Sequence, residues 1–253
     1  MRTTMVDVPT ADGVADAYLV RPDGDGPHPG VLVFMDAFGL RPRIEEMADR
    51  IAERGYAVLA PNILYRGGRS PQVDLSGLKD PEQRRRAFEK VFPFIQGLDT
   101  AAITRDTGAY LDFLHGQDGV DPGPVAVVGY CMGGTNAVKA IEAYPDQITA
   151  VASFHGGRLV SDRPDSPHLS VGRITGAAYF AHADNDASMN AEQIKTLESA
   201  LDEAGVNYRS EVYPGSPHGF TMADTATYHE PGERRHWVNL FELLDRELPV
   251  PGR

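Results

Sequence analysis

The ten-residue segment Val125–Gly134 constrains the fold more than any other part of the sequence. The apolar run Val125–Val128 is typical of a strand that is buried on both faces. It leads into Gly129-Tyr-Cys-Met-Gly133, which has the G-x-S-x-G spacing with Cys131 at the serine position. In such an elbow the glycines let neighbouring backbone approach closely, and the central side chain stands above a sheet. The segment therefore predicts a strand, a sharp turn and a helix in direct succession.

Cys131 is the only cysteine of the chain, so no internal disulfide can form. At the start of a helix the dipole favours the thiolate, which is the nucleophilic form of the side chain. The alternative is a structural cysteine that packs as a small hydrophobic residue. Cys131 is thus a candidate nucleophile.

Composition limits the class of protein. With 253 residues and 42% hydrophobic content, the chain can form one α/β domain with a sizeable core, and we expect a single domain over 1–253. The formal net charge of −12 argues against a nucleic-acid partner, since such proteins favour basic surfaces. The sequence starts without an apolar signal region and has no apolar run of about 20 residues. We therefore expect a cytoplasmic protein without a membrane partner, as a monomer or small homo-oligomer.

Strands and helices alternate along most of the chain. The expected strands are 5–8, 15–21, 31–35, 56–60, 125–128, 149–154, 177–182 and 207–213. The expected helices are 44–54, 100–114, 132–143, 190–204 and 233–247. This order predicts an α/β fold with a mostly parallel central sheet and helices on both faces.

Two segments interrupt the alternation. Residues 62–96 are rich in Arg, Gly, Pro and Asp and contain a helical stretch near 81–91. A segment of this length is either a functional lid or a solvated surface excursion. Residues 158–175 form a second irregular loop, expected at the edge of the sheet.

His218 is the strongest candidate base among the eight histidines. It lies in the turn-rich segment Tyr213–Phe220, directly after an expected strand, and ligand sites favour the carboxyl ends of such strands. A base that activates a nucleophile needs an acid to orient it. Asp184 and Asp186 follow the preceding strand, and the one that does not orient the base is expected to cap the turn.

Three segments of the chain together resemble the dienelactone hydrolase family, a branch of the α/β-hydrolase superfamily with a Cys-His-Asp triad. They are Gly129–Gly134, Ala183–Met189 and Tyr213–Phe220, and the resemblance covers nearly the whole chain. It implies an α/β-hydrolase fold and hydrolysis of an ester or lactone through a thiolate and an acyl-thioester intermediate. It also implies a triad of Cys131, His218 and Asp186, and so favours Asp186 over Asp184.

The same resemblance assigns roles to the segment Phe34–Gly39. The family carries a thiol-modulating acid here, usually glutamate, and this chain has the shorter Asp36. The resemblance implies that Asp36 contacts Cys131 in the resting enzyme. The backbone N–H groups of Ala37 and Met132 are expected to form the oxyanion hole.

The substrate pocket is less well defined. Family members that hydrolyse a carboxylated lactone grip its carboxylate with two arginines; Arg66 and Arg69 are candidates for the first. Met222 stands at the second position and cannot pair with a carboxylate, so the sequence predicts a preference for neutral esters. Seven side chains are expected to line the pocket: Phe38, Tyr65, Arg66, Arg69, Tyr130, Phe220 and Met222. For the aromatic ones among them, the alternative is a place in the hydrophobic core.

Two other functions stay open at this stage. One is a non-catalytic protein that binds a small molecule on a hydrolase scaffold. The other is a thiol redox sensor, although the chain has no second cysteine and no C-x-x-C motif. No metal-ligand spacing and no phosphate-binding or dinucleotide fingerprint occurs, so neither a metal nor a cofactor is expected.

Overall fold

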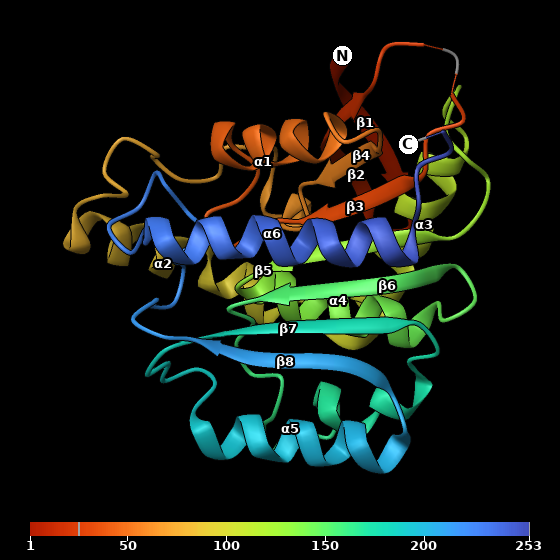
Figure 1. Ribbon diagram of the computed structural model, residues 1–253. Helices are drawn as coiled ribbons and strands as arrows, with labels where there is room; N and C mark the ends of the chain where they lie inside the picture. The colour runs from red at the N-terminus through yellow and green to blue at the C-terminus, as the bar shows by residue number, and fades with distance from the viewer. Residues whose placement is uncertain (25, 253) are drawn as a thin grey trace.

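The protein is built around one eight-stranded sheet, shown in Figure 1 for a computed structural model that describes residues 1–24 and 26–252. The strand order is β1-β2-β4-β3-β5-β6-β7-β8. The strands are β1 (Arg2–Thr10), β2 (Gly13–Arg21), β3 (Gly30–Phe34), β4 (Ala57–Pro61), β5 (Val125–Tyr130), β6 (Ile148–Phe154), β7 (Ala177–Ala183) and β8 (Asn207–Tyr213). β2 pairs antiparallel with β1 and β4, and every pair from β4 through β3 to β8 is parallel. The predicted mostly parallel sheet is thereby confirmed.

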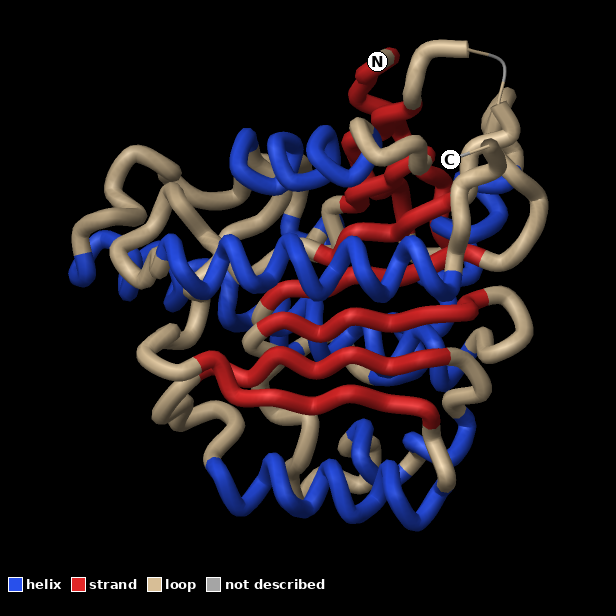
Figure 2. Tube along the Cα trace, viewed as in Figure 1, coloured by secondary structure: helices blue, strands red, loops and turns tan. Residues whose placement is uncertain are grey.

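Helices cover both faces of this sheet (Figures 1 and 2). α1 (Pro42–Ala52) and α6 (Glu230–Glu247) lie over one face, and α3 (Thr100–His115) and α4 (Met132–Ala143) lie over the other. The remaining helical elements are α2 (Pro81–Gln96), α5 (Ala191–Ala204) and the 3-10 turns η1 (Tyr65–Gly67), η2 (Pro167–Leu169) and η3 (Val171–Arg173).

Polar side chains and proline fix several helix ends. Asp80 accepts from the N–H of Gln83 and so caps α2, and Asn190 forms a capping box at the start of α5. α6 begins at Glu230, earlier than the expected position 233. Pro231 fits its first turn because the N–H groups there have no partner within the helix, and proline has no N–H to leave unpaired.

The centre of the sheet is the centre of the core. Every residue of β3, β4 and β5 is buried, as the continuous apolar runs predict for strands covered on both faces. β6, β7 and β8 end at the left of Figure 1, where the 62–96 excursion with α2 also lies. The loops at this edge carry the candidate site.

Candidate active site

Cys131 lies at a strained turn between β5 and α4. Its backbone φ of 56° and ψ of −120° place it in a region that non-glycine residues rarely adopt. A methyl group added to Gly129 would collide with the carbonyl group of Gly133, and one added to Gly133 would collide with the carbonyl group of Phe34 at the end of β3. The close backbone approach predicted from these glycines is confirmed.

Three side chains form a hydrogen-bonded row at this edge of the sheet. Nε2 of His218 lies 3.0 Å from Sγ of Cys131, and Nδ1 of His218 lies 2.6 Å from Oδ2 of Asp186. Cys131 follows β5, Asp186 follows β7 and His218 follows β8, so the parallel strands bring all three to one place. The His218 side chain is 33% exposed and that of Asp186 only 4%, so solvent reaches the imidazole but not the carboxylate.

The two candidate acids have different partners. The second carboxylate oxygen of Asp186 accepts from the backbone N–H and the hydroxyl of Ser188, at 2.8 and 2.7 Å. Asp184 instead accepts from the N–H of Gly215 at 2.8 Å and from the side chain of Asn185. Asp186 is therefore the acid beside His218, and Asp184 holds the turns that follow β7 and β8.

Charge in the row favours an imidazolium. Burial lowers the pKa of His218, but a negative Cys131 and the hydrogen bond to Asp186 outweigh it and hold this pKa well above its usual value. Burial also opposes the ionisation of Asp186, yet hydrogen bonds from His218 and Ser188 lower the pKa of this carboxyl. The arrangement therefore favours a protonated His218 next to an ionised carboxylate.

His155, which the sequence analysis did not single out, joins the elbow to the His218 loop. It follows β6, is 1% exposed and has a φ of 40°. The backbone N–H of Cys131 is shared between two acceptors, Nδ1 of His155 and the carbonyl of Phe154, each at 3.1 Å. Nε2 of His155 lies 2.8 Å from Oγ1 of Thr221. Because Nδ1 accepts, Nε2 carries the proton and donates to Thr221. Burial and the neighbouring His218 lower the pKa of His155, so the ring is neutral.

Asp36 binds an arginine that the sequence analysis did not anticipate. Its Oδ1 and Oδ2 lie 2.6 and 3.0 Å from Nη1 and Nη2 of Arg41, which is buried. Arg41 also binds Asp224 at 2.6 Å, and its Nη2 lies 3.5 Å from Sδ of Met222. Among the described residues, the Asp36 carboxylate makes no hydrogen bond to Cys131, and Arg41 offers both of its oxygens a charge-assisted partner.

The backbone around Ala37 supplies an unpaired donor. Asp36 fixes this loop through two hydrogen bonds. Its side chain accepts from the N–H of Phe38 at 3.0 Å, and its backbone carbonyl accepts from the N–H of Gly39 at 3.1 Å. In the described part of the chain, the N–H of Ala37 between them donates to no acceptor. Met132 is the first residue of α4, and the first N–H groups of a helix have no partner within it.

The predicted lining residues of the 62–96 excursion are engaged elsewhere. The hydroxyl of Tyr65 donates to Asp106 at 3.0 Å, and Arg66 pairs with the same carboxylate at 2.7 Å. Arg69 pairs with Asp7 of β1 at 2.8 Å. These contacts direct all three side chains toward α3 and the β1–β2 end of the sheet.

The other predicted lining residues differ in exposure. Tyr130 and Phe220 are fully buried and belong to the hydrophobic core, which was the alternative for the aromatic residues. Met222 is 1% exposed and lies in the core as well. The core position of Tyr130 includes a 3.0 Å hydrogen bond from its hydroxyl to Nε2 of His236. Phe38 is partly buried, with its ring 5.9 Å from the guanidinium of Arg41.

A cavity of about 380 Å³ lies near the elbow, although Cys131, Asp186 and His218 are not among the residues that line it. It is lined by Met132 at the elbow, by Gly157 beyond His155, and by Ile95 and Gln96 at the end of α2. This volume lies in the range of pockets for small molecules.

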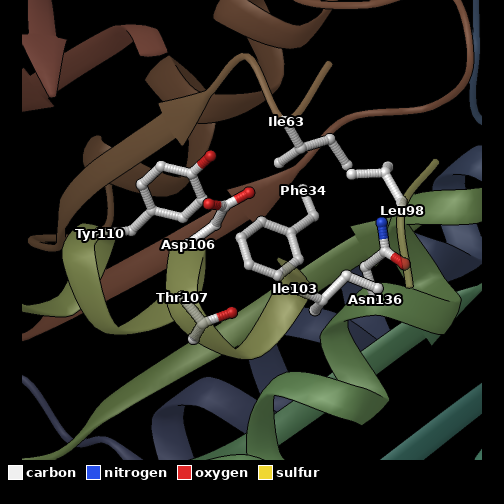
Figure 3. Close-up of a pocket in the computed structure, with 8 residues that line it drawn as sticks. All are labelled: Phe34, Ile63, Leu98, Ile103, Asp106, Thr107, Tyr110 and Asn136. Carbon is white, nitrogen blue, oxygen red and sulfur yellow. The ribbon is translucent and has the colours of Figure 1, made fainter. Parts of the chain in front are cut away.

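A second cavity, shown in Figure 3, lies between Phe34, Asp106 and Tyr110 and measures about 10 Å³. Such a volume suits a single water molecule. The buried hydroxyls of Thr107 and Tyr110 face no hydrogen-bond partner among the described residues. This cavity is therefore too small for a substrate.

Within residues 1–24 and 26–252, no group of three or more His, Cys, Asp or Glu side chains is arranged to hold a metal ion. No helix in that part combines the length and apolar character required to cross a membrane.

Solved structures with the same architecture define the fold class. The chain is 22% identical to a Klebsiella pneumoniae protein assigned as a dienelactone hydrolase, with a TM-score of 0.81 over 97% of this chain and 98% of that one. It is 26% identical to a dienelactone hydrolase-like promiscuous phosphotriesterase from metagenomic libraries, with a TM-score of 0.75 over 98% and 99%. The fold is the α/β-hydrolase fold.

Sequence relatives narrow this class to a family. The sequence model of the dienelactone hydrolase family matches residues 15–248. A Mus musculus carboxymethylenebutenolidase homolog is 30% identical over 91% of this chain and 86% of the relative. A Synechocystis sp. protein assigned as a carboxymethylenebutenolidase is 26% identical over 98% of both chains. The chain belongs to the dienelactone hydrolase family.

Proposed function

We propose that this protein hydrolyses esters or lactones with Cys131 as nucleophile, His218 as acid and base, and Asp186 as the orienting acid. The observation that carries the proposal is the row of 3.0 and 2.6 Å contacts at a strained strand-to-helix turn. The names of the relatives, carboxymethylenebutenolidases, point to a lactone as one substrate.

The first half-reaction forms a thioester. The thiolate of Cys131 attacks the substrate carbonyl, and the C–S bond forms as the carbonyl oxygen takes the negative charge. When the tetrahedral intermediate collapses, the C–O bond to the alkoxide breaks and the Nε2 proton of His218 passes to that oxygen. For a lactone, the alcohol stays attached to the acyl group because the ring opens.

The second half-reaction releases the acid. Neutral His218 takes a proton from water, and the resulting hydroxide attacks the thioester. Collapse of this intermediate breaks the C–S bond and restores the thiolate–imidazolium pair. Asp186 holds Nδ1 of His218 protonated through both steps, so that Nε2 always faces the reacting atoms.

The developing oxyanion needs preorganised donors. We assign this role to the backbone N–H groups of Ala37 and Met132, which are free of other acceptors for the reasons given above. One such donor contributes about 2.7–4 kcal/mol in comparable sites. Arg41 positions the first donor because it fixes Asp36, and Asp36 fixes the loop on either side of Ala37.

We place the substrate in the cavity of about 380 Å³. Met132, which directly follows Cys131 in the chain, lines this cavity, and so do Ile95 and Gln96 at the end of α2. In this arrangement the 62–96 excursion serves as a lid over the cavity.

The test uses p-nitrophenyl acetate with the wild type, Cys131→Ala and Cys131→Ser, and intact mass after a rapid quench. We expect a transient acetyl adduct on the wild type and loss of turnover in Cys131→Ala. Cys131→Ser keeps a hydroxyl near His218 but lacks an ionised thiol, so we expect its rate to lie far below that of the wild type. Unchanged turnover in Cys131→Ala would refute the proposal and leave Cys131 as a structural residue.

A further inference from the structure

Two strained residues meet where the elbow contacts the end of β6. Cys131 has a φ of 56° and His155 a φ of 40°, both in a region that non-glycine residues rarely adopt. Such backbone conformations persist only where the surroundings hold them in place, and they cluster at functional sites. Besides the carbonyl of Phe154, the acceptor that holds the N–H of Cys131 is Nδ1 of His155. The position of this imidazole is therefore part of what holds the candidate nucleophile.

The bond to Cys131 exists in only one tautomer of His155. Nδ1 can accept from the backbone N–H only when it carries no proton, and the ring is buried and neutral, so its single proton lies on Nε2. Oγ1 of Thr221 lies 2.8 Å from this nitrogen. Across residues 1–24 and 26–252, Nε2 has no second acceptor within hydrogen-bond distance. The hydroxyl oxygen of Thr221 is therefore the group that pairs with this proton.

Thr221 is held in place from outside the row of three side chains. It is fully buried, and its carbonyl accepts from Nη2 of Arg43 in α1 at 2.7 Å. Arg43 also pairs with Glu233 in α6, which lies over the same face of the sheet as α1 (Figure 1). Because two helices fix the backbone of Thr221, its hydroxyl oxygen offers Nε2 of His155 an acceptor in a constant place.

The ring of His155 also touches the loop of the candidate base. It packs edge-on against the ring of His218, with 5.3 Å between the centroids, and against that of Phe220, with 5.0 Å. Thr221 itself stands three residues after His218. Movement of this imidazole would therefore change both sides of the 3.0 Å contact between Sγ of Cys131 and Nε2 of His218.

We infer that Thr221 is a positioning residue that acts through His155: its hydroxyl oxygen holds the imidazole proton on Nε2, which leaves Nδ1 to hold the elbow. The inference rests on the proposed hydrolysis at Cys131 and adds to it a residue outside the reacting row. Without this oxygen, the ring shifts to find a partner for a buried Nε2 proton, or the proton moves to Nδ1 and faces the N–H of Cys131. In both cases the bond that aligns the elbow with His218 weakens.

Two substitutions of Thr221 separate its oxygen from its shape. Thr221→Val keeps the volume and removes the acceptor, whereas Thr221→Ser removes a methyl group and keeps the acceptor. The loss of one hydrogen bond predicts that kcat/KM for p-nitrophenyl acetate falls about 3- to 10-fold in Thr221→Val, through kcat rather than KM, and by less than about two-fold in Thr221→Ser. Equal losses in both variants would make Thr221 a packing residue and overturn the inference.

Thr225→Val is the matched control in the same loop. Thr225 is also buried, but its hydroxyl donates to the carbonyl of Met222 rather than pairing with His155. We expect this variant to behave as the wild type, and a loss equal to that of Thr221→Val would overturn the inference in favour of a general effect of the loop. Thr221→Val combined with His155→Gln should lose no more than His155→Gln alone, because both changes remove the same bond. Additive losses would refute an action through His155.

A measurement without turnover separates this inference from the proposed function. NMR of the protein with histidine labelled by nitrogen-15 shows which imidazole nitrogen carries the proton, and the signals of His155 are those absent from His155→Gln. A proton on Nδ1 of His155 in the wild type would overturn the inference, whatever the protein hydrolyses.

Alkylation by neutral iodoacetamide reports on Cys131 alone, because it is the only cysteine. Its rate at about pH 6 should fall about 3- to 10-fold in Thr221→Val and stay unchanged in Thr225→Val. This result together with an Nε2 proton, but without ester hydrolysis by the wild type, would support the positioning role and refute the proposed function. Ester hydrolysis with an unchanged alkylation rate in Thr221→Val would support the function and refute the inference.

Discussion

Replacing Asp186 by Asn tests whether the carboxylate stabilises the thiolate–imidazolium pair. The 2.6 Å bond from Nδ1 of His218 to a carboxylate that is 4% exposed is a charge-assisted hydrogen bond in a poorly solvated place. Such bonds contribute about 1.5–3 kcal/mol, and 1.4 kcal/mol corresponds to a factor of ten. Without the carboxylate we expect the pKa of His218 to fall, and the thiolate fraction at mildly acidic pH to fall about 10- to 100-fold.

The rate of iodoacetamide alkylation against pH measures this fraction at the single cysteine. Since the pKa of Asp186 is lowered and that of His218 is raised, the ion pair should persist from acidic through neutral pH, and the wild-type rate should change little there. In Asp186→Asn the rate should be low at about pH 6 and rise toward the wild-type rate above the ordinary thiol pKa of about 8.5.

Asp184→Asn provides the control, because Asp184 binds Gly215 and Asn185 and does not touch His218. Its profile should match that of the wild type. If Asp186→Asn also matched the wild type at about pH 6, Asp186 would not stabilise the pair, and the assignment of the acid would be refuted.

Two further predictions concern buried groups. His155→Gln should lower kcat/KM for p-nitrophenyl acetate about 10-fold, because the N–H of Cys131 loses one of its two acceptors and keeps only the carbonyl of Phe154. His182→Gln, at another buried histidine bound to Ser210, should leave kcat/KM unchanged; an equal loss would contradict the positioning role of His155. Burial raises the pKa of Glu142 to about 7, so folding penalises its charge and stability falls as pH rises through about 4.5–7. Glu142→Gln should therefore stabilise the protein by about 2–3 kcal/mol in urea unfolding at pH 8 and by little at pH 4.5; an equal gain at both would contradict this.

Local sequence patterns were sufficient to predict the architecture. The continuous apolar runs of β3, β4 and β5 and the spacing of apolar residues in α1 follow directly from burial on a sheet. Boundaries were less predictable because they depend on contacts beyond the pattern. α2, for example, continues past the expected position 91 and through Pro93 to Gln96.

The site was predictable where a residue type stands at a strand end. His218 was proposed in this way, and Cys131 was proposed from the spacing of the glycines around it. The choice of Asp186 over Asp184 needed the family resemblance, since both aspartates follow β7. His155 also stands at a strand end, directly after β6, so the same rule could have found it. Its partner is a backbone N–H, however, and no side-chain motif records such a bond.

The network of Arg41 could not have been predicted from local sequence. Arg41 and Asp224 lie 183 positions apart, and only the folded sheet brings them together. The same is true of the aromatic residues expected in the pocket. Tyr130 directly precedes Cys131 and Phe220 lies two residues after His218, but both rings are buried in the core, where contacts from distant parts of the chain cover them.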